Sequence, residues 1–285
     1  MSRTVYVNGS YLPEDQATVS IFDRGFVFAD GIYEVSAVIE GRLVDVEAHL
    51  IRLERSCGEI QLPLPWSRPE LVAIHKELIA RNNLKEGGVY LQVTRGPADR
   101  DFAFPKEPKP TLVMFTQARK ILDSEKARTG VKVVSCEDIR WARRDIKSVA
   151  LLAQVLAKQY AAASGADEAW MTEDGYVTEG GSSTSWIVKG DTIISRPLSN
   201  DVLPGITRRA LLGLLAETEY TFEERPFTLD EAFAADEAFY TSASGFVMPI
   251  VEIDGNRIGG GQPGPAARRL REIYITEALK GGALG

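Results

Sequence analysis

The chain has 285 residues, 44% hydrophobic and 26% charged, a mixture typical of a globular protein long enough for two ordinary domains. Its net charge of −7 argues against nucleic acid as a partner, and no apolar run is long enough to span a bilayer. Only two cysteines and two histidines occur, without metal-ligand spacing. We therefore expect no metal site and a protein of the reducing cytoplasm.

The N-terminal part of the sequence predicts an α+β domain over residues 1–117, with strands ahead of helices. Asn8-Gly9 lies between alternating apolar residues, which is a strong hairpin signal. Helical spacing predicts helices over 48–60 and, after the N-cap type Ser67, over 67–82. Further strands are predicted at 32–39, 43–46, 89–96 and 111–117.

The polar segment 118–130 is interpreted as an interdomain linker, and residues 131–285 as a second domain. Strand patterns recur through this second domain from 131–139 to the hairpin at 247–258. Its predicted helices follow Ser148 and occupy 208–220, 229–235 and 266–279.

Lys147 is the centre of the most informative stretch. Apolar residues recur at helical spacing after Ser148, an N-cap type, so Lys147 should lie in the turn before a helix. Three arginines lie just upstream, at positions 140, 143 and 144. A lysine near other cations and a helix N-terminus should lose its proton more easily, and imine chemistry needs a neutral amine. A lone lysine at such a place is, however, more often simply solvated.

Three further features accompany Lys147. Glu179 ends a strand before a Gly/Ser loop, where its carboxylate could pair with a pyridinium nitrogen. The turn 204–207 precedes a helix and offers backbone N–H groups and a threonine hydroxyl to an anion. The hydroxyl-rich loop 241–244 could supply more donors to a phosphate. Taken alone, each feature also occurs without function, as a strand-end acid, a helix cap or a polar loop.

Together and in this order, the stretches resemble the class IV transaminases that use pyridoxal phosphate (PLP), and within them the D-amino-acid (D-alanine) aminotransferases. The shared stretches are DRGFVFADGIYE, HLIRL, VTRG, EDIRWARRDIKS, VTEGGSS, LPGITR and TSAS. The resemblance implies an α/β (α+β) fold of type IV: a smaller N-terminal α/β domain, a larger C-terminal domain, and the cofactor in the cleft between them. It also implies at least a homodimer with a shared active site.

The resemblance assigns roles to the residues that match these motifs. Lys147 would form the Schiff base with PLP and move a proton between substrate Cα and cofactor C4′, and Glu179 would hold the pyridine nitrogen. The residues implied at the phosphate are Arg52, Ile206, Thr207, Ser242 and, through its backbone N–H alone, Ala243.

Substrate recognition departs from the family pattern at one position. Tyr33 and Arg100 match residues that hold the substrate carboxylate, but Phe102 stands where related enzymes have a histidine. Phenylalanine cannot donate a hydrogen bond, so one charge-assisted contact is absent and the substrate range stays open.

The expected activity is a ping-pong transfer of an amino group from a D-amino acid to a 2-oxo acid, pyruvate or 2-oxoglutarate. The alternatives within the family are a branched-chain L-amino-acid aminotransferase, an (R)-selective amine transaminase and an aminodeoxychorismate lyase. Outside it, the alternative is a catalytically silent binding protein on the same scaffold. Retention of Lys147, Glu179 and Arg52 argues against that last alternative.

Overall fold

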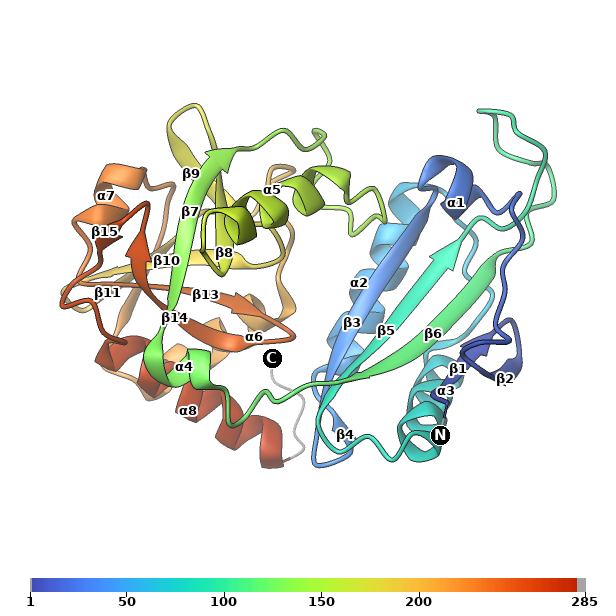
Figure 1. The fold of residues 1–285 in the computed structure, drawn as a ribbon, viewed down its shortest axis with the longest axis horizontal. Coiled ribbons are helices and arrows are strands. Elements are labelled where there is room, and N and C mark those ends of the chain that lie inside the picture. The colour runs from blue at the N-terminus through green and yellow to red at the C-terminus, as the bar shows by residue number, and fades with distance from the viewer. Residues whose placement is uncertain (1, 281–285) are drawn as a thin grey trace. The chain divides into compact units, whose positions relative to one another are not determined.

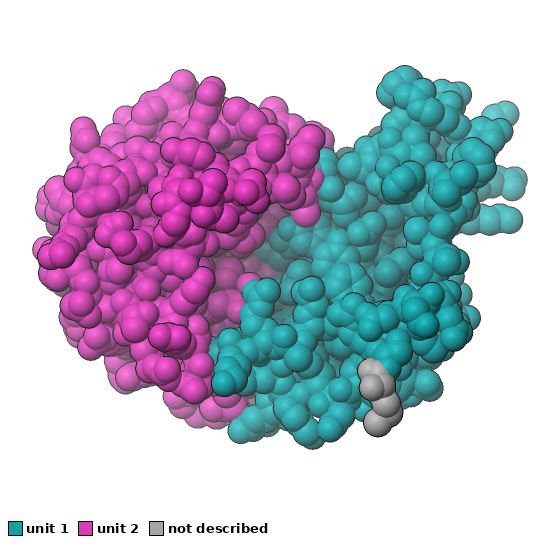
Figure 2. Space-filling model, viewed as in Figure 1, with its two compact units in different colours: residues 1–121, 146–150 teal, residues 122–145, 151–285 magenta. Residues whose placement is uncertain are grey.

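The computed structural model describes residues 2–280, which form two compact units. Of the described residues, 2–121 and 146–150 belong to unit 1, and 122–145 and 151–280 belong to unit 2 (Figure 2). These bounds differ from the expected 1–117 and 131–285, above all because the five residues around Lys147 belong to unit 1. The segment 118–130, interpreted as a linker, contains the short helix α4 (Glu125–Thr129). No helix within residues 2–280 is long and apolar enough to cross a membrane.

Unit 1 is built on a six-stranded antiparallel sheet in the order β2-β1-β6-β5-β3-β4 (Figure 1). The predicted hairpin at Asn8-Gly9 is confirmed: both residues have positive φ, 46° and 97°, as a tight two-residue turn requires. The strands are β1 (Thr4–Val7), β2 (Ser10–Pro13), β3 (Gly31–Ile39), β4 (Arg42–Leu43), β5 (Gly87–Thr94) and β6 (Thr111–Ala118).

Two helices, α2 (Val46–Glu59) and α3 (Arg68–Arg81), cover one face of this sheet and enclose its apolar core (Figure 1). The predicted start of α3 is confirmed, since Ser67 and Glu70 form a capping box and Pro69 lies in the first turn. The start of α2 at Val46 leaves the strand expected at 43–46 only its first residue, in β4. The short helix α1 (Arg24–Phe28) was not expected; Asp23 caps it by accepting a hydrogen bond from Gly25 N.

Unit 2 is built on a mixed nine-stranded sheet in the order β12-β11-β10-β13-β14-β7-β8-β9, with β15 paired to β14. The pairs β11–β12, β14–β7 and β7–β8 are parallel and the others are antiparallel. The strands are β7 (Val131–Glu137), β8 (Glu168–Glu173), β9 (Tyr176–Gly180), β10 (Thr184–Lys189), β11 (Thr192–Ser195), β12 (Thr221–Glu224), β13 (Glu237–Ser242), β14 (Phe246–Ile253) and β15 (Asn256–Arg257).

Two helices of unit 2 begin at other residues than the sequence predicted. Helix α5 (Leu152–Ala163) begins at Leu152, so the helix predicted to follow Ser148 directly was wrong at its start, and Ser148 instead forms a β-bridge with Ile32. Helix α6 (Ile206–Leu214) begins earlier than expected and takes the phosphate-site candidates into its first turn. The unit also contains the short 3₁₀ helix η1 (Leu215–Glu217) and the helices α7 (Leu229–Phe233) and α8 (Pro265–Lys280).

Candidate active site

Lys147 is held in unit 1 by backbone pairing with the start of β3. Tyr33 N donates to the Lys147 carbonyl over 3.1 Å, and Val149 N donates to the Gly31 carbonyl over 3.0 Å. The Ile146 side chain is buried in the apolar core of the same unit. The backbone on both sides of the lysine is therefore fixed, and its side chain starts from a defined position.

The amine of Lys147 lies against an aromatic row on the sheet of unit 1. Its Nζ is 4.1 Å from the centroid of the Tyr33 ring. Tyr33 stacks on Tyr90 at 5.7 Å between centroids, and Tyr90 stacks on Phe115 at 4.7 Å. Unit 1 thus brings together the lysine predicted for catalysis and the tyrosine predicted for substrate binding.

The arginines upstream of Lys147 are paired with carboxylates of unit 2 and do not form a free cationic cluster. Arg143 Nε donates to Asp145 over 2.9 Å, and Arg144 Nη1 donates to Glu173 over 2.7 Å. Helix α5 also starts later than expected. The helix start and the free arginine cluster expected beside Lys147 therefore do not take the predicted form.

Arg52, predicted at the phosphate, is a buried cation paired with Glu34 on β3. Arg52 Nε and Nη2 donate to the two oxygens of Glu34 over 2.7 and 2.8 Å, and His49 Nδ1 lies 2.7 Å from Oε2. Burial pushes the pKa of Glu34 upward, but Arg52 and His49 outweigh it and hold that pKa well below its usual range. Sequence reasoning missed Glu34 and His49. The signal available was the spacing of His49 and Arg52, which places both on one face of α2.

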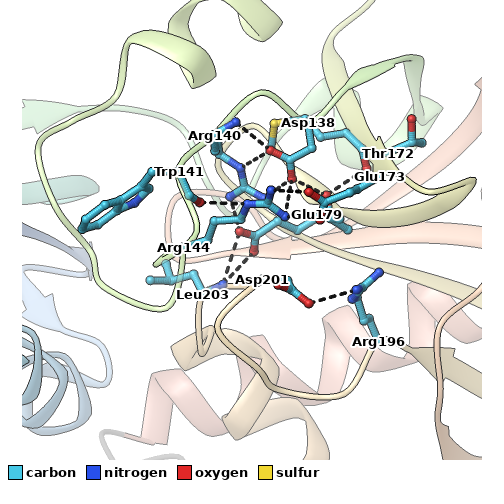
Figure 3. Close-up of polar contacts among 12 residues, drawn as sticks. Asp138, Arg140, Trp141, Arg144, Thr172, Glu173, Glu179, Arg196, Asp201 and Leu203 are labelled. Atoms are coloured by element: carbon cyan, nitrogen blue, oxygen red, sulfur yellow. Dashed lines mark hydrogen bonds and ion pairs between the residues drawn. The ribbon is translucent and has the colours of Figure 1, made fainter.

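Glu179 occupies a buried position at the end of β9 in unit 2 (Figure 3). Arg140 Nη1 forms an ion pair with Oε1, and Leu203 N donates to both carboxylate oxygens over 3.2 Å. Burial raises the pKa of Glu179, while Arg140 and the Leu203 N–H partly offset that rise by stabilising the carboxylate. The group is therefore an acid held at low solvent exposure by fixed donors.

Arg140 is itself fixed by a string of alternating charges (Figure 3). Its Nε and Nη2 donate to the two oxygens of Asp138 over 2.9 and 2.7 Å, which raises the Arg140 pKa further. Asp138 also accepts a hydrogen bond from Thr178 Oγ1 over 2.6 Å and lies 3.4 Å from Arg144 Nη1. Sequence reasoning left Asp138 without a role, although EDIR in the shared stretch places an acid two residues before Arg140.

The first turn of α6 has the features of an anion site. Its N-cap residue, Gly205, has no side chain with which to cap the first N–H groups. A Cβ at Gly205 would lie 2.8 Å from Thr184 Oγ1, so the position suits glycine. Thr207 Oγ1 is buried and has no hydrogen-bond partner among the described residues. An unsatisfied buried hydroxyl costs about 1–3 kcal/mol, so this arrangement favours a ligand that bonds the hydroxyl.

The turn between β13 and β14 carries the other phosphate candidates, Ser242 and Ala243, and its backbone is tightly held. Ser242 Oγ accepts a hydrogen bond from Gly245 N over 3.1 Å. Phe246 has φ +59°, which is rare for an aromatic residue. Arg271 of α8 donates to the carbonyls of Gly245 and Val247 over 2.6 and 3.0 Å and thereby holds the turn in this conformation.

Arg100 and Phe102 lie on the loop 97–110 of unit 1. The Arg100 guanidinium rests against two rings, with its Cζ 5.4 Å from the Phe28 centroid and 5.5 Å from the Phe102 centroid. Phe102 is 77% exposed, which is unusual for so large an apolar side chain. The loop therefore presents a cation on an exposed aromatic surface.

Comparison with known proteins extends these observations to the whole chain. The model of the family "Amino-transferase class IV" matches residues 31–253. A D-alanine aminotransferase of Staphylococcus haemolyticus is 41% identical over 273 residues, which cover 95% of this chain and 96% of that protein. A D-alanine aminotransferase of Bacillus licheniformis is 39% identical over 275 residues, covering 96% and 97%.

Solved structures show the same fold. A T.th. branched-chain amino acid aminotransferase with pyridoxamine 5'-phosphate has a TM-score of 0.90 at 24% identity, covering 98% of this chain and 95% of that one. The branched-chain aminotransferase of Thermoproteus uzoniensis with norvaline has a TM-score of 0.85 at 25% identity, covering 98% and 96%. The two-unit α/β (α+β) architecture expected from the sequence is thereby confirmed as the fold of these aminotransferases.

Proposed function

Because the chain belongs to the class IV aminotransferases, we propose that it transfers an amino group from a D-amino acid to a 2-oxo acid, with PLP as its cofactor. The relatives that match nearly its whole length at 39–41% identity are D-alanine aminotransferases. D-Alanine is accordingly the donor proposed first, and pyruvate and 2-oxoglutarate are the acceptors.

The observation that carries the proposal is the placement of the Lys147 amine 4.1 Å from the centre of the Tyr33 ring. Transamination removes a proton from the substrate carbon that bears the carboxylate, so the base must lie next to the group that holds that carboxylate. In our assignment, Lys147 Nζ would take the proton from substrate Cα and hold it for return to the product. Tyr33 then orients the carboxylate through its hydroxyl.

The chemistry of the donor set fits PLP. When bound, PLP supplies a carbonyl group that condenses with amines and a ring that accepts the electrons left at substrate Cα. Glu179, whose carboxyl oxygens contact Arg140 and Leu203 N, would attract the protonated pyridine nitrogen. Thr207 would satisfy its buried hydroxyl by bonding the phosphate. The further phosphate ligands in this proposal are Arg52, the Ile206 N–H, Ser242 and the Ala243 N–H.

We also propose a homodimer in which Arg100 binds the substrate carboxylate in the neighbouring subunit. Phe102 on the Arg100 loop and Phe26 on α1 are both 77% exposed, and large exposed aromatic side chains are typical of protein contact surfaces. A protein that is monomeric and fully active at low concentration would contradict the shared site.

A panel of donors tests the proposed activity and separates it from its rivals. D-Alanine, L-leucine and (R)-1-phenylethylamine are each offered with pyruvate and with 2-oxoglutarate, and the amino acid formed is measured. We expect conversion of D-alanine with at least one acceptor. Conversion of L-leucine alone would indicate a branched-chain enzyme, and conversion of the amine alone an (R)-selective amine transaminase.

Two further readouts address the remaining alternatives. An aminodeoxychorismate lyase would release pyruvate from that substrate without any amino acceptor. A silent scaffold would stay colourless after incubation with PLP, whereas a lysine-bound cofactor makes the protein yellow.

A further inference from the structure

Arg24 binds the backbone of the loop that carries Arg100. It is the first residue of α1 and only 3% exposed. Its Nη1 donates to the carbonyls of Asp101 and Ala103 over 2.6 and 3.3 Å, and its Nη2 donates to the Phe102 carbonyl over 3.4 Å. One buried guanidinium thus collects the consecutive carbonyls that follow Arg100, as its fork of donors allows.

Asp30 ties Arg24 to the interior of unit 1. Arg24 Nε donates to Asp30 Oδ2 over 2.8 Å, and Arg95 donates to both Asp30 oxygens over 2.7 and 3.0 Å. Arg95 is 1% exposed and also donates to the carbonyls of Ile60 and Gln61, each over 2.8 Å. The Arg24 guanidinium is therefore held by a buried, fully engaged set of charges.

Both ends of the same loop are anchored as well. Arg24 N donates to the Gly96 carbonyl over 3.0 Å, and Asp23 forms a β-bridge with Pro97. Gly96 has φ +84°, and a Cβ there would lie 1.8 Å from the Lys109 carbonyl oxygen. The outgoing and returning arms of the loop thus pass each other at van der Waals distance, a close approach that only glycine permits.

Aromatic side chains around the anchored loop contact Arg100 and orient its guanidinium. Phe104 lies over Arg95, with its centroid 3.6 Å from Cζ, and Phe28 lies 4.7 Å from Arg24 Cζ. Phe28 and Phe102 are 5.4 Å apart, and they are the two rings against which Arg100 rests. Arg24 touches the backbone of one ring residue and the ring of the other.

We propose that Arg24 is a positioning residue for the substrate carboxylate. By holding carbonyls 101–103 it keeps Phe102 beside Phe28, and the two rings keep Arg100 ordered before substrate arrives. An arginine ordered in advance loses less side-chain freedom on binding, so less of its interaction energy is spent on ordering. Phe102 then acts through its ring and not as a hydrogen-bond donor. This inference rests on the proposed function, in which Arg100 binds the carboxylate.

The kinetic test uses the PLP-loaded enzyme and the variants Arg24→Gln and Arg24→Lys. For Arg24→Gln we expect KM for D-alanine to rise about tenfold or more, the scale of a weakened charge-assisted contact, with kcat nearly unchanged. The half-reaction with D-alaninol, which lacks a carboxylate, should be unaffected. Arg24→Lys should fall between wild type and Arg24→Gln, because it keeps a charge for Asp30 but loses the fork.

A matched control is Arg81→Gln. Arg81 is another arginine of unit 1 that lies over a ring, Tyr11 at 4.5 Å, and pairs with a carboxylate, Glu77 at 2.7 Å, but does not touch the loop. Its replacement should leave KM for D-alanine unchanged. A rise equal to that of Arg24→Gln would show a general structural effect and overturn the inference.

Limited trypsin digestion of the loaded enzyme reports the order of the loop independently of activity. Arg100 and Lys106 are exposed cleavage sites on it. Cleavage there should be faster in Arg24→Gln than in wild type or Arg81→Gln. If Arg24→Gln does not fold, Arg24→Lys carries both tests.

The outcomes separate this inference from the proposed function. If Arg100→Ala leaves KM for D-alanine unchanged, the proposed carboxylate contact is wrong and the inference falls with it. If Arg100→Ala raises KM but the Arg24 variants change neither KM nor the rate of cleavage, only the positioning role is overturned.

Discussion

Replacing Arg140 by methionine should destabilise unit 2 in a strongly pH-dependent way. Arg140 and Glu179 form a buried ion pair, with side chains 5% and 6% exposed. Methionine keeps much of the volume of arginine but removes its charge, so Glu179 is left in the interior without its cation. Asp138, whose pKa Arg140 also lowers, keeps Thr178 and Arg144 as partners.

The size of the destabilisation is limited by protonation of Glu179, because a protonated carboxyl no longer needs a cation. From an ordinary pKa of 4.5, protonation costs 1.36 kcal/mol for each pH unit above that value. This cost is the upper limit of the loss in free energy of unfolding that the stranded charge can cause. It amounts to about 4.8 kcal/mol at pH 8 and about 1.4 kcal/mol at pH 5.5. Loss of one partner of a buried pair typically costs about 3–5 kcal/mol, so we expect that loss at pH 8 and less than half of it at pH 5.5.

The direction of the pH dependence of stability follows from the pKa of Glu179, which is raised in the folded protein and which loss of Arg140 raises further. Between the unfolded and the folded pKa, the folded state binds more protons than the unfolded state. The free energy of unfolding of the variant therefore falls as pH rises through that window and recovers as pH is lowered.

Urea unfolding of the cofactor-free protein measures this loss, followed by the fluorescence of Trp170 and Trp186, which are fully buried in unit 2. Adding Glu179→Gln to Arg140→Met removes the stranded charge and should restore most of the stability at pH 8. Equal losses at the two pH values, or effects of the two substitutions that add within about 0.5 kcal/mol, would refute the reasoning.

Further predictions concern single residues of the site. Lys147→Ala should abolish transamination, and borohydride reduction of the loaded wild type followed by peptide mapping should label Lys147 and no other lysine. Thr207→Val removes an unsatisfied buried hydroxyl, so the cofactor-free protein should gain about 1 kcal/mol in urea unfolding while the Kd for PLP rises. Arg52→Lys keeps a cation beside Glu34 but loses the guanidinium fork, so PLP should be lost faster during gel filtration. Phe102→His should favour D-alanine over D-alaninol by about 1–3 kcal/mol in kcat/KM.

Local signals in the sequence were reliable where the partners are close in the chain. Ser67, as an N-cap type, predicted the start of α3, and Asn8-Gly9 predicted the first hairpin. Ser148 has the same local character as Ser67, yet it pairs with Ile32 and no helix starts there. That pairing joins residues far apart in sequence, and no pattern near Ser148 indicates it.

The same distinction holds for the candidate site. The family motifs identified Lys147 and Tyr33, and their proximity in unit 1 agrees with the roles proposed for them. The ion pairs that surround the predicted residues could not be read from the sequence, because Arg24, Asp30 and Arg95 look like ordinary surface charges until the chain brings them together. The cationic cluster expected beside Lys147 failed for the same reason: the carboxylates that engage those arginines include Glu173, on a separate strand.

The route of the chain limits how this protein can be taken apart. It passes from one unit to the other after residues 121, 145 and 150, and the segment 146–150 carries Lys147. A fragment ending at residue 121 would lack Ile146 from its apolar core and the hydrogen bond from Val149 to Gly31. Neither unit is therefore one continuous piece of chain that can be exchanged alone. A chimera with a relative must be joined after residues 121, 145 and 150 if unit 1 is to keep its own Lys147.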